Sequence, residues 1–318
     1  MEGPHLELFR RSVRHATEGC TGEELDAALD DLGWEDALGE DAPAAVSVLF
    51  ESQGAANTRS SALGRVLGHV LGLAGGAGAP LVVLPPLGGC NPPGRVVGSV
   101  CTTAGLAMGG GSSGETTVVV TGSGDGRALA LPAGALTWRT AVGIDPALAL
   151  REVSGEVPLD ATEPLGVAAW DHALALGQLA VGHELLGAAR AMLELARRHA
   201  LEREQFGRPI GAFQAVRHRL AEALVWSEAA ASLLGASWED PSAHAAMAKA
   251  FAGSAAKLVA RHAQQVIAGI GFTTEHPLHR YVRRTILLDQ LLGAATSLTR
   301  RLGTEVLATG TLPPAVPL

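Results

Sequence analysis

Side chains suited to holding a phosphate-bearing ligand gather between Arg203 and Gln214. The guanidinium of Arg203 can pair with an oxygen of a diphosphate through a planar, charge-assisted fork of donors. Gln205 and Gln214 add amide donors and acceptors, and Phe206 offers a flat apolar surface. Taken alone, the same residues also fit a helix that ends in a positive charge and a phenylalanine that belongs to the core. The stretch therefore suggests diphosphate binding, with an ordinary helix end as the alternative.

A second stretch with binding chemistry runs from Gln265 to Glu275 and is rich in glycine. Gln265 carries another amide, and Gly269 lacks the Cβ atom that would keep a ligand away from the backbone. The alternative is that Gly269 only ends a helix. Because the two stretches occur together and in this order, the sequence favours a shared binding role over two unrelated helix ends.

Several familiar motifs are absent. No G-K-[S/T] follows Gly109–Gly114, so this segment is not a phosphate-cradling P-loop. The cluster Gly122–Gly126 leads into a β-type run, whereas a dinucleotide fingerprint must open a helix, so both clusters are expected to be turns. The sequence contains neither H-E-x-x-H nor G-x-S-x-G, and its histidines show no metal-ligand spacing. His262 interrupts an apolar stripe and is expected to be a hydrogen-bonded core residue.

The composition indicates a globular protein. The chain has 318 residues, of which 47% are hydrophobic and 18% charged, and a formal charge of −8. This balance argues against a nucleic-acid or membrane-surface partner. Cys20, Cys90 and Cys101 show no C-x-x-C spacing, which fits a reducing cytosol and argues against a structural zinc site. The first twenty residues mix charges among apolar positions and predict neither a signal peptide nor a membrane span.

The N-terminal and middle parts of the chain differ in the secondary structure that their sequence patterns predict. Helical patterns are expected at 24–32, 44–51 and 60–73, with glycine near their ends. From about residue 75 to 160, Gly- and Pro-rich pieces separate short β-type runs at 81–84, 97–100, 116–120 and 128–131. Residues 123–126 form a good turn between the last two runs, so a hairpin is expected there.

From about residue 165 onward the pattern is regular and helical. Four apolar stripes begin at Leu174, Ile210, Met247 and Leu278, and breaks at 207–209, 240–241 and 269–277 separate them. Long helices with short connections pack as an antiparallel bundle. The sequence thus predicts a mainly α protein with a small β unit: a helical domain at 1–80, a reduced β domain at 81–162 and a four-helix bundle at 163–318.

The two binding stretches carry a family resemblance. Residues 203–214 closely resemble the R-x-x-F-G-x-x-I-x-x-F-Q signature of acyl-CoA dehydrogenases. Residues 265–275 look like the family's Q-x-x-G-G-x-G-[FY]-x-x-E segment, although Ala268 replaces the first glycine of the pair. The segments 32–34 and 46–54 are similar to the opening helical domain of the family. The resemblance covers both ends of the chain but not its middle.

The resemblance implies FAD as the cofactor and a role across a subunit interface. Family members hold the adenosine-diphosphate half of an FAD whose flavin ring lies mainly on the neighbouring subunit. The positions that match those contacts are Arg203, Gln205, Phe206, Gln214, Gln265 and Gly269.

The catalytic base of the family is missing. Members remove the acyl α-proton with a carboxylate, a step that needs a positioned general base. Where most members carry this glutamate, the present chain has Leu292; where some use an earlier helix, it has Gly177 beside Gln178. Asp289 and Glu275 are the nearest carboxylates. Asp289 lies one helical turn from Leu292 and stays open as a relocated base, while Glu275 matches a structural position.

The middle domain departs from the family as well, since no T-E-P-x-x-G-S-D loop or W-I-T segment occurs. This pattern resembles the short subunits of heteromeric dehydrogenases, built from two chains of each of two kinds, that degrade steroid side chains attached to CoA. It implies a homologous partner subunit that supplies the glutamate, an acyl-CoA substrate and an electron-transfer flavoprotein as acceptor. By itself the chain is then expected to be inactive, with no catalytic residue of its own.

Two alternatives stay open from the sequence. The chain could be a homo-oligomeric flavoenzyme that uses a relocated base such as Asp289. It could also be a scaffold subunit that keeps the bundle only for assembly, although such a subunit has no evident need for the Arg203 and Gln265 stretches.

Overall fold

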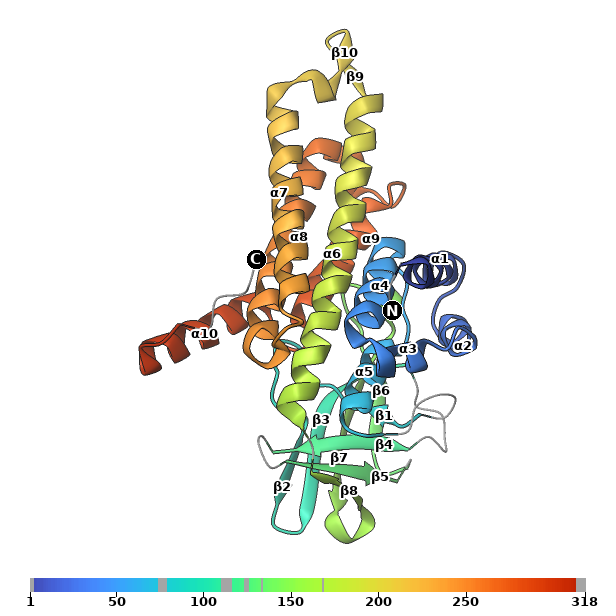
Figure 1. The fold of residues 1–318 in the computed structure, drawn as a ribbon, viewed down its shortest axis with the longest axis vertical. Coiled ribbons are helices and arrows are strands. Elements are labelled where there is room, and N and C mark those ends of the chain that lie inside the picture. The colour runs from blue at the N-terminus through green and yellow to red at the C-terminus, as the bar shows by residue number, and fades with distance from the viewer. Residues whose placement is uncertain are drawn as a thin grey trace.

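The computed structural model describes residues 3–73, 79–109, 116–122, 126–132, 134–167 and 169–312. A β-sheet lies at one end of the molecule, long helices extend from it to the other end, and the N-terminal helices pack alongside (Figure 1). The mainly α architecture with a small β unit agrees with the expectation from the sequence.

The helix expected at 44–51 is longer than expected, because Gly54 lies inside it and not at its end. The carboxylate of Asp41 accepts a hydrogen bond from the backbone N–H of Ala44 at 3.0 Å and caps the start of this helix, and the residue after its end, Asn57, is left-handed. The indole N–H of Trp34 donates to the carbonyl of Ala45 at 3.1 Å in the buried interior. The helices are α1 Pro4–Gly19, α2 Glu23–Asp31, α3 Trp34–Glu40, α4 Ala42–Ala56 and α5 Ala62–Val70.

Eight strands of the described part form one mostly antiparallel sheet in the order β6-β7-β3-β2-β4-β5-β8, with β1 beside β4. Alternation along β4 sends Val118 and Val120 into the main core and Val119 into a second, smaller core on the other face. The strands are β1 Leu81–Val82, β2 Gly94–Val97, β3 Val100–Met108, β4 Thr117–Thr121, β5 Arg127–Leu131, β6 Thr137–Thr140, β7 Leu150–Pro158 and β8 Glu163–Val167.

The expected hairpin is present, because β4 and β5 pair antiparallel. Residues 123–125 of its expected turn, and the segment 110–114, lie outside the described residues. The expected strand at 97–100 is wrong: Val97 ends β2, Val100 begins β3, and the two residues between them form a turn in which Gly98 has a φ of 60°. The valines on both sides of Gly98 suggest a strand, but the glycine favours a tight turn that reverses the chain. The sheet continues through β8, and the domain limits at 80 and 162 stay a prediction.

The C-terminal helices form a bundle around α6. They are α6 Trp170–Glu202, α7 Gln214–Ala236, α8 Pro241–Ile267, α9 Leu278–Gln290 and α10 Ala295–Thr309, with the small hairpin β9 Glu204–Gln205 and β10 Arg208–Pro209 after α6. The fourth expected helix is wrong as a continuous element, because it breaks between α9 and α10. Leu292 and Gly293 have φ values of 54° and 104° at this break, and an α-helix cannot continue through such residues.

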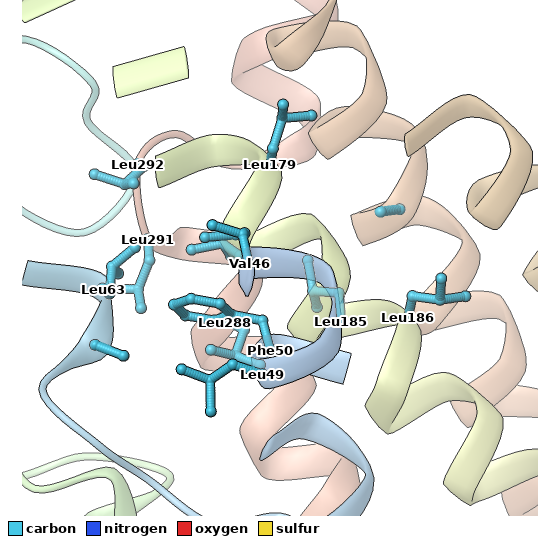
Figure 2. Packing of buried hydrophobic residues seen from close by; sticks show 14 of the residues in the cluster. Val46, Leu49, Phe50, Leu63, Leu179, Leu185, Leu186, Leu288, Leu291 and Leu292 are labelled. Carbon is cyan, nitrogen blue, oxygen red and sulfur yellow. The ribbon is translucent and has the colours of Figure 1, made fainter. Parts of the chain in front are cut away.

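Small residues bring α4 and α6 into backbone contact. A Cβ atom added at Gly54 would lie 2.0 Å from the carbonyl oxygen of Glu184, and one at Gly187 would lie 2.1 Å from that of Glu51. Leucines of α6, α9 and the residues after α9 then pack against α4 and α5 in one continuous core (Figure 2). The N-terminal helices and the bundle therefore share a single apolar interior.

A buried ion cluster links all three regions. The guanidinium of Arg284 on α9 donates to the carboxylate of Asp145 before β7 and to the carbonyl of Thr58 after α4. Glu184 on α6 lies 3.7 Å from Arg284 and is 2% exposed. Among the described residues its Oε1 atom has no hydrogen-bond partner. Burial raises the pKa of Glu184 to about 7, against the attraction of Arg284.

Glu184 is expected to make the stability of the chain depend on pH. An acid with a raised folded-state pKa favours its protonated form, so the fold loses stability as the pH rises from about 4.5 to about 7. The variant Glu184→Gln keeps the shape without titrating, and it should be about 1–3 kcal/mol more stable than the wild type at pH 8 but not at pH 4.5. Urea unfolding at both pH values measures the difference. A constant difference between the two proteins would contradict this assignment.

Candidate functional site

The predicted cofactor-binding residues all lie at the end of the bundle that is far from the sheet. Helix α6 ends there, α7 begins there, and α8 runs antiparallel to α7 and returns to the same end (Figure 1). Every one of these residues is exposed in the single chain: Arg203, Gln205, Phe206, Gln214, Gln265 and Gly269. The set thus shares one end of the molecule and faces outward.

The β9–β10 hairpin holds Phe206 outward. Gln205 pairs with Arg208 across a two-residue turn in which Phe206 and Gly207 have φ values of 55° and 77°. Positive φ at both central positions defines a type I′ turn, which favours glycine but not phenylalanine. Phe206 is nonetheless 92% exposed, and its ring is in a T-shaped arrangement with that of Phe213, with ring centroids 6.1 Å apart. A strained, exposed aromatic residue of this kind marks a contact surface.

Arg203 is positioned by the backbone and its side chain is uncommitted. Its N–H donates to the carbonyl of His199 at 2.9 Å, and its carbonyl accepts from Ile210 at 2.8 Å. The guanidinium makes no ion pair or side-chain hydrogen bond among the described residues, so it remains available to an anion. Partial burial, helped by the charge of Arg203, lowers the pKa of the neighbouring His199.

Gln205 in the hairpin and Gly269 after α8 also lack close partners from other segments that the structure describes. Gln205 donates only to the carbonyl of its neighbour Glu204 at 2.7 Å. At Gly269 a Cβ atom would meet nothing within 4 Å, so close packing within this chain does not require a glycine there. The left-handed position is instead Ala268, with a φ of 58°. This conformation explains why the family places a glycine where the chain has alanine.

The two positions where the resemblance would place a base lie against each other. A Cβ atom added at Gly177 would come within 2.7 Å of Leu292 Cδ1 and 2.9 Å of Leu67 Cδ1. Leu292 is 1% exposed, and Gln178 donates to its carbonyl oxygen at 2.9 Å. An apolar contact therefore fills the space in which a carboxylate would have to stand.

Asp289 is engaged in holding the break between α9 and α10. Its carboxylate pairs with Lys257 at 2.9 Å and accepts from the N–H of Ala295 at 3.2 Å. The buried ammonium of Lys249 donates to the carbonyls of Asp289 and Gly293. Burial lowers the pKa of Lys249 to about 7. Sequence reasoning missed Lys249, and a lysine flanked by the apolar run of residues 245–252 was the signal that could have drawn attention to it.

The remaining candidates behave as expected or lie outside the site. His262 is buried and bonds through Nε2 to Glu222 at 3.0 Å, which confirms it as a hydrogen-bonded core histidine. Glu275 is exposed. Within the described ranges, no group of His, Cys, Asp and Glu side chains could hold a metal ion, and the cysteines are free. No described helix combines the length and the apolar character needed to cross a membrane.

Comparison with known proteins finds a family match over the bundle. The model of the family "Acyl-CoA dehydrogenase, C-terminal domain" matches residues 165–307. The C-terminal part of the chain is therefore similar to that domain. The match takes in the exposed end of the bundle and the positions of Gly177, Asp289 and Leu292.

A curated relative is similar over part of this chain. Acyl-CoA dehydrogenase IpdE2 from Mycolicibacterium smegmatis is 40% identical over 129 residues, which cover 40% of this chain and 42% of the relative. The chain thus matches about two fifths of that protein's length.

Solved structures are similar over nearly the whole chain. A chain of the ChsE4-ChsE5 complex from Mycobacterium tuberculosis superposes with a TM-score of 0.77 at 22% identity, covering 96% of this chain and 98% of that chain. A variant of the Tcur3481-Tcur3483 steroid ACAD gives a TM-score of 0.76 at 24% identity, covering 96% and 98%. At these identities the likeness shows the fold. The acyl-CoA dehydrogenase fold therefore extends through the sheet and the N-terminal helices, beyond the bundle.

Proposed function

We propose that this chain is one subunit of a heteromeric, FAD-dependent acyl-CoA dehydrogenase of the cytosol that forms an α,β-double bond in a CoA thioester. It contributes contacts to the adenosine-diphosphate half of FAD across the subunit interface, while a homologous partner supplies the catalytic glutamate. One observation carries the proposal: the residues that match the family's FAD contacts are all exposed at one end of the bundle, whereas Leu292 packs against Gly177 where the base would stand.

The exposed residues fit the diphosphate part of FAD. Arg203 offers an uncommitted guanidinium, which suits a diphosphate oxygen. Gln205, Gln214 and Gln265 offer amides, and the turn at Phe206 presents a flat ring to whatever covers it. When bound, FAD would accept the hydride from the acyl β-carbon; the residues named here bind and orient it.

The bundle surface supports a protein partner. The apolar stripe of α7 is only partly buried in the single chain, and Leu224 and Val225 are 50% and 65% exposed. Phe272, after α8, is 69% exposed. Exposed apolar residues that continue into the cofactor-binding end fit an interface formed by this bundle. A heterotetramer with two chains of each kind is the assembly that we propose.

The proposed substrate class rests on similarity to solved structures and not on a cavity in this chain. Two similar folds come from proteins described as the ChsE4-ChsE5 complex and as a steroid ACAD. We therefore propose a bulky, steroid side-chain acyl-CoA, with an electron-transfer flavoprotein as acceptor by family resemblance. The space beside Gly177 is filled by Leu67 and Leu292, so the acyl chain would react on the partner's side.

The structure offers less support for a homo-oligomeric enzyme or a scaffold subunit. A homo-oligomeric enzyme would need Asp289 as its base, but that carboxylate is 3% exposed and is paired with Lys257. A pure scaffold would have no use for an unpaired Arg203 beside an exposed Phe206. The heteromeric dehydrogenase accounts for both observations.

Arg203→Ala is expected to remove most of the flavin from the assembled complex while leaving the complex intact. Losing one charge-assisted contact to a diphosphate costs about 1.5–3 kcal/mol, which weakens binding roughly tenfold to hundredfold. The measurement is the visible flavin spectrum and the mass of the complex after co-expression with genomic neighbours of the same family.

Arg197→Ala is the matched control, because Arg197 is exposed in the last part of α6, shortly before Arg203, and pairs with Glu194 at 2.7 Å. Full flavin occupancy in the Arg203 variant would remove the assigned role. One flavin per subunit in the chain purified alone would overturn the heteromeric proposal.

A further inference from the structure

A cavity unrelated to the exposed end of the bundle opens between α1, α4 and α6. Its volume is about 510 Å³, which lies within the range of roughly 300–1,000 Å³ found for small-molecule sites. From its lining we propose that it binds a small amphipathic carboxylate. This inference does not rest on the proposed function.

One wall of the cavity is cationic. Arg10 and Arg14 lie one turn apart on α1 and both line it. They flank the stripe of Val13, Ala16 and Thr17 that buries α1 against its neighbours. Spacing of four residues on a helix places the two guanidinium groups on the same side, so α1 presents them together to the cavity.

On the opposite wall, positively and negatively charged side chains pair with each other. Arg190 on α6 pairs with Glu51 at 2.9 Å and with Glu228 at 3.4 Å. The other oxygen of Glu51 lies 2.9 Å from His183 Nδ1, and the indole N–H of Trp238 donates to His183 Nε2 at 3.2 Å. Since an indole can only donate, Nε2 accepts and Nδ1 carries the proton that bonds Glu51. The charge of Glu51 is therefore already compensated.

The guanidinium of Arg14 remains uncommitted. It has no ion-pair partner among the described residues, whereas Arg10 pairs with the exposed Glu7 at 3.1 Å. Such an exposed pair is weak. Glu18 also lines the cavity and subtracts one charge, so the site suits a single negative charge. A carboxylate matches a guanidinium in a bidentate manner.

The side of the cavity formed by α4 is partly apolar and favours a ligand with an apolar part. Val48, Ala55 and Ala56 line it beside the hydroxyl groups of Ser47 and Ser52. An apolar group that covers these side chains gains free energy in proportion to the area it removes from water. Affinity should therefore grow with the apolar size of a monocarboxylate.

The test titrates the full chain, in its assembled form, with acetate, butyrate and 3-phenylpropionate by calorimetry. We expect saturable one-site binding that tightens along this series, and binding of 3-phenylpropionate at least tenfold weaker in Arg14→Gln. Arg11→Gln is the matched control: it removes the same charge from the same helix at an exposed residue that does not line the cavity. The neutral amide 3-phenylpropionamide should bind at least tenfold more weakly than the acid.

Three results would overturn the proposal. They are the absence of saturable binding for all three acids, equal losses in the Arg14 and Arg11 variants, and equal affinity for acid and amide. If Arg14→Gln instead weakens subunit assembly while no acid binds, the cavity takes a carboxylate from a neighbouring chain and the small-molecule site is refuted. Circular dichroism of both variants establishes that each is folded.

Discussion

Replacing Arg284 by methionine is expected to lower the free energy of unfolding by about 3–5 kcal/mol, because it leaves buried charges without their partner. Arg284 is 1% exposed and is held by Asp145, by the carbonyl of Thr58 and by Glu184. Methionine fills much of the space but donates no hydrogen bond. The carboxylate of Asp145, itself 9% exposed, would then have to be protonated or hydrated inside the fold.

Urea unfolding of the Arg284→Met variant measures this loss. Arg283→Met is the matched control, because Arg283 is exposed one position earlier on α9, and it should change stability by less than about 0.5 kcal/mol. The double variant Arg284→Met with Asp145→Asn should recover part of the loss, since it removes the unpaired charge. Equal stabilities for the Arg284 and Arg283 variants would show that the cluster does not hold the three regions together.

Periodicity predicted the helices well because their buried faces repeat at the helical spacing. The third stripe corresponds to α8, where Ala255 and Val266 are buried as expected. Helix α6 differs, because residues 173–189 are all buried and this part of the helix is covered on several sides. The hairpin β4–β5 was predictable because its turn residues and its apolar runs agree.

The failures arise where distant contacts decide the backbone. The stripe from Leu278 to Leu302 keeps helical spacing through the break at 291–294, and Lys249 and Gln178 on other helices supply donors for the carbonyls that the break frees. Sequence spacing contains no information on these contacts. The short strand expected at 97–100 failed because a single Gly98 outweighs its apolar neighbours.

The sequence could name the candidate residues, which stay a prediction, but it could not show that they share one surface. The order of the two motifs along the chain suggested that Arg203 and Gln265 have a shared binding role. Their shared exposure follows from helix lengths and directions, which place the ends of α6 and α8 at one end of the bundle (Figure 1). The closure of the base position could not be predicted, because it depends on Leu67 from the N-terminal helices.

Leu292→Glu restores the residue type of the family base, yet it is expected to destabilise the chain by about 3–5 kcal/mol without creating activity. Leu292 is 1% exposed and packs against Gly177, so a carboxylate there would be buried without a partner. The ammonium of Lys249 is already held by two carbonyls. Burial would raise the pKa of the new carboxyl, and the loss should therefore be larger at pH 8 than at pH 5.

Urea unfolding at the two pH values and a dehydrogenase assay of the chain alone test this expectation. Leu292→Met keeps the apolar volume and should cost less than about 1.5 kcal/mol. If Leu292→Glu were as stable as Leu292→Met, the space beside Gly177 would have to be open rather than packed. Activity in the glutamate variant alone would show that this chain has a complete site of its own and would contradict the proposed need for a partner.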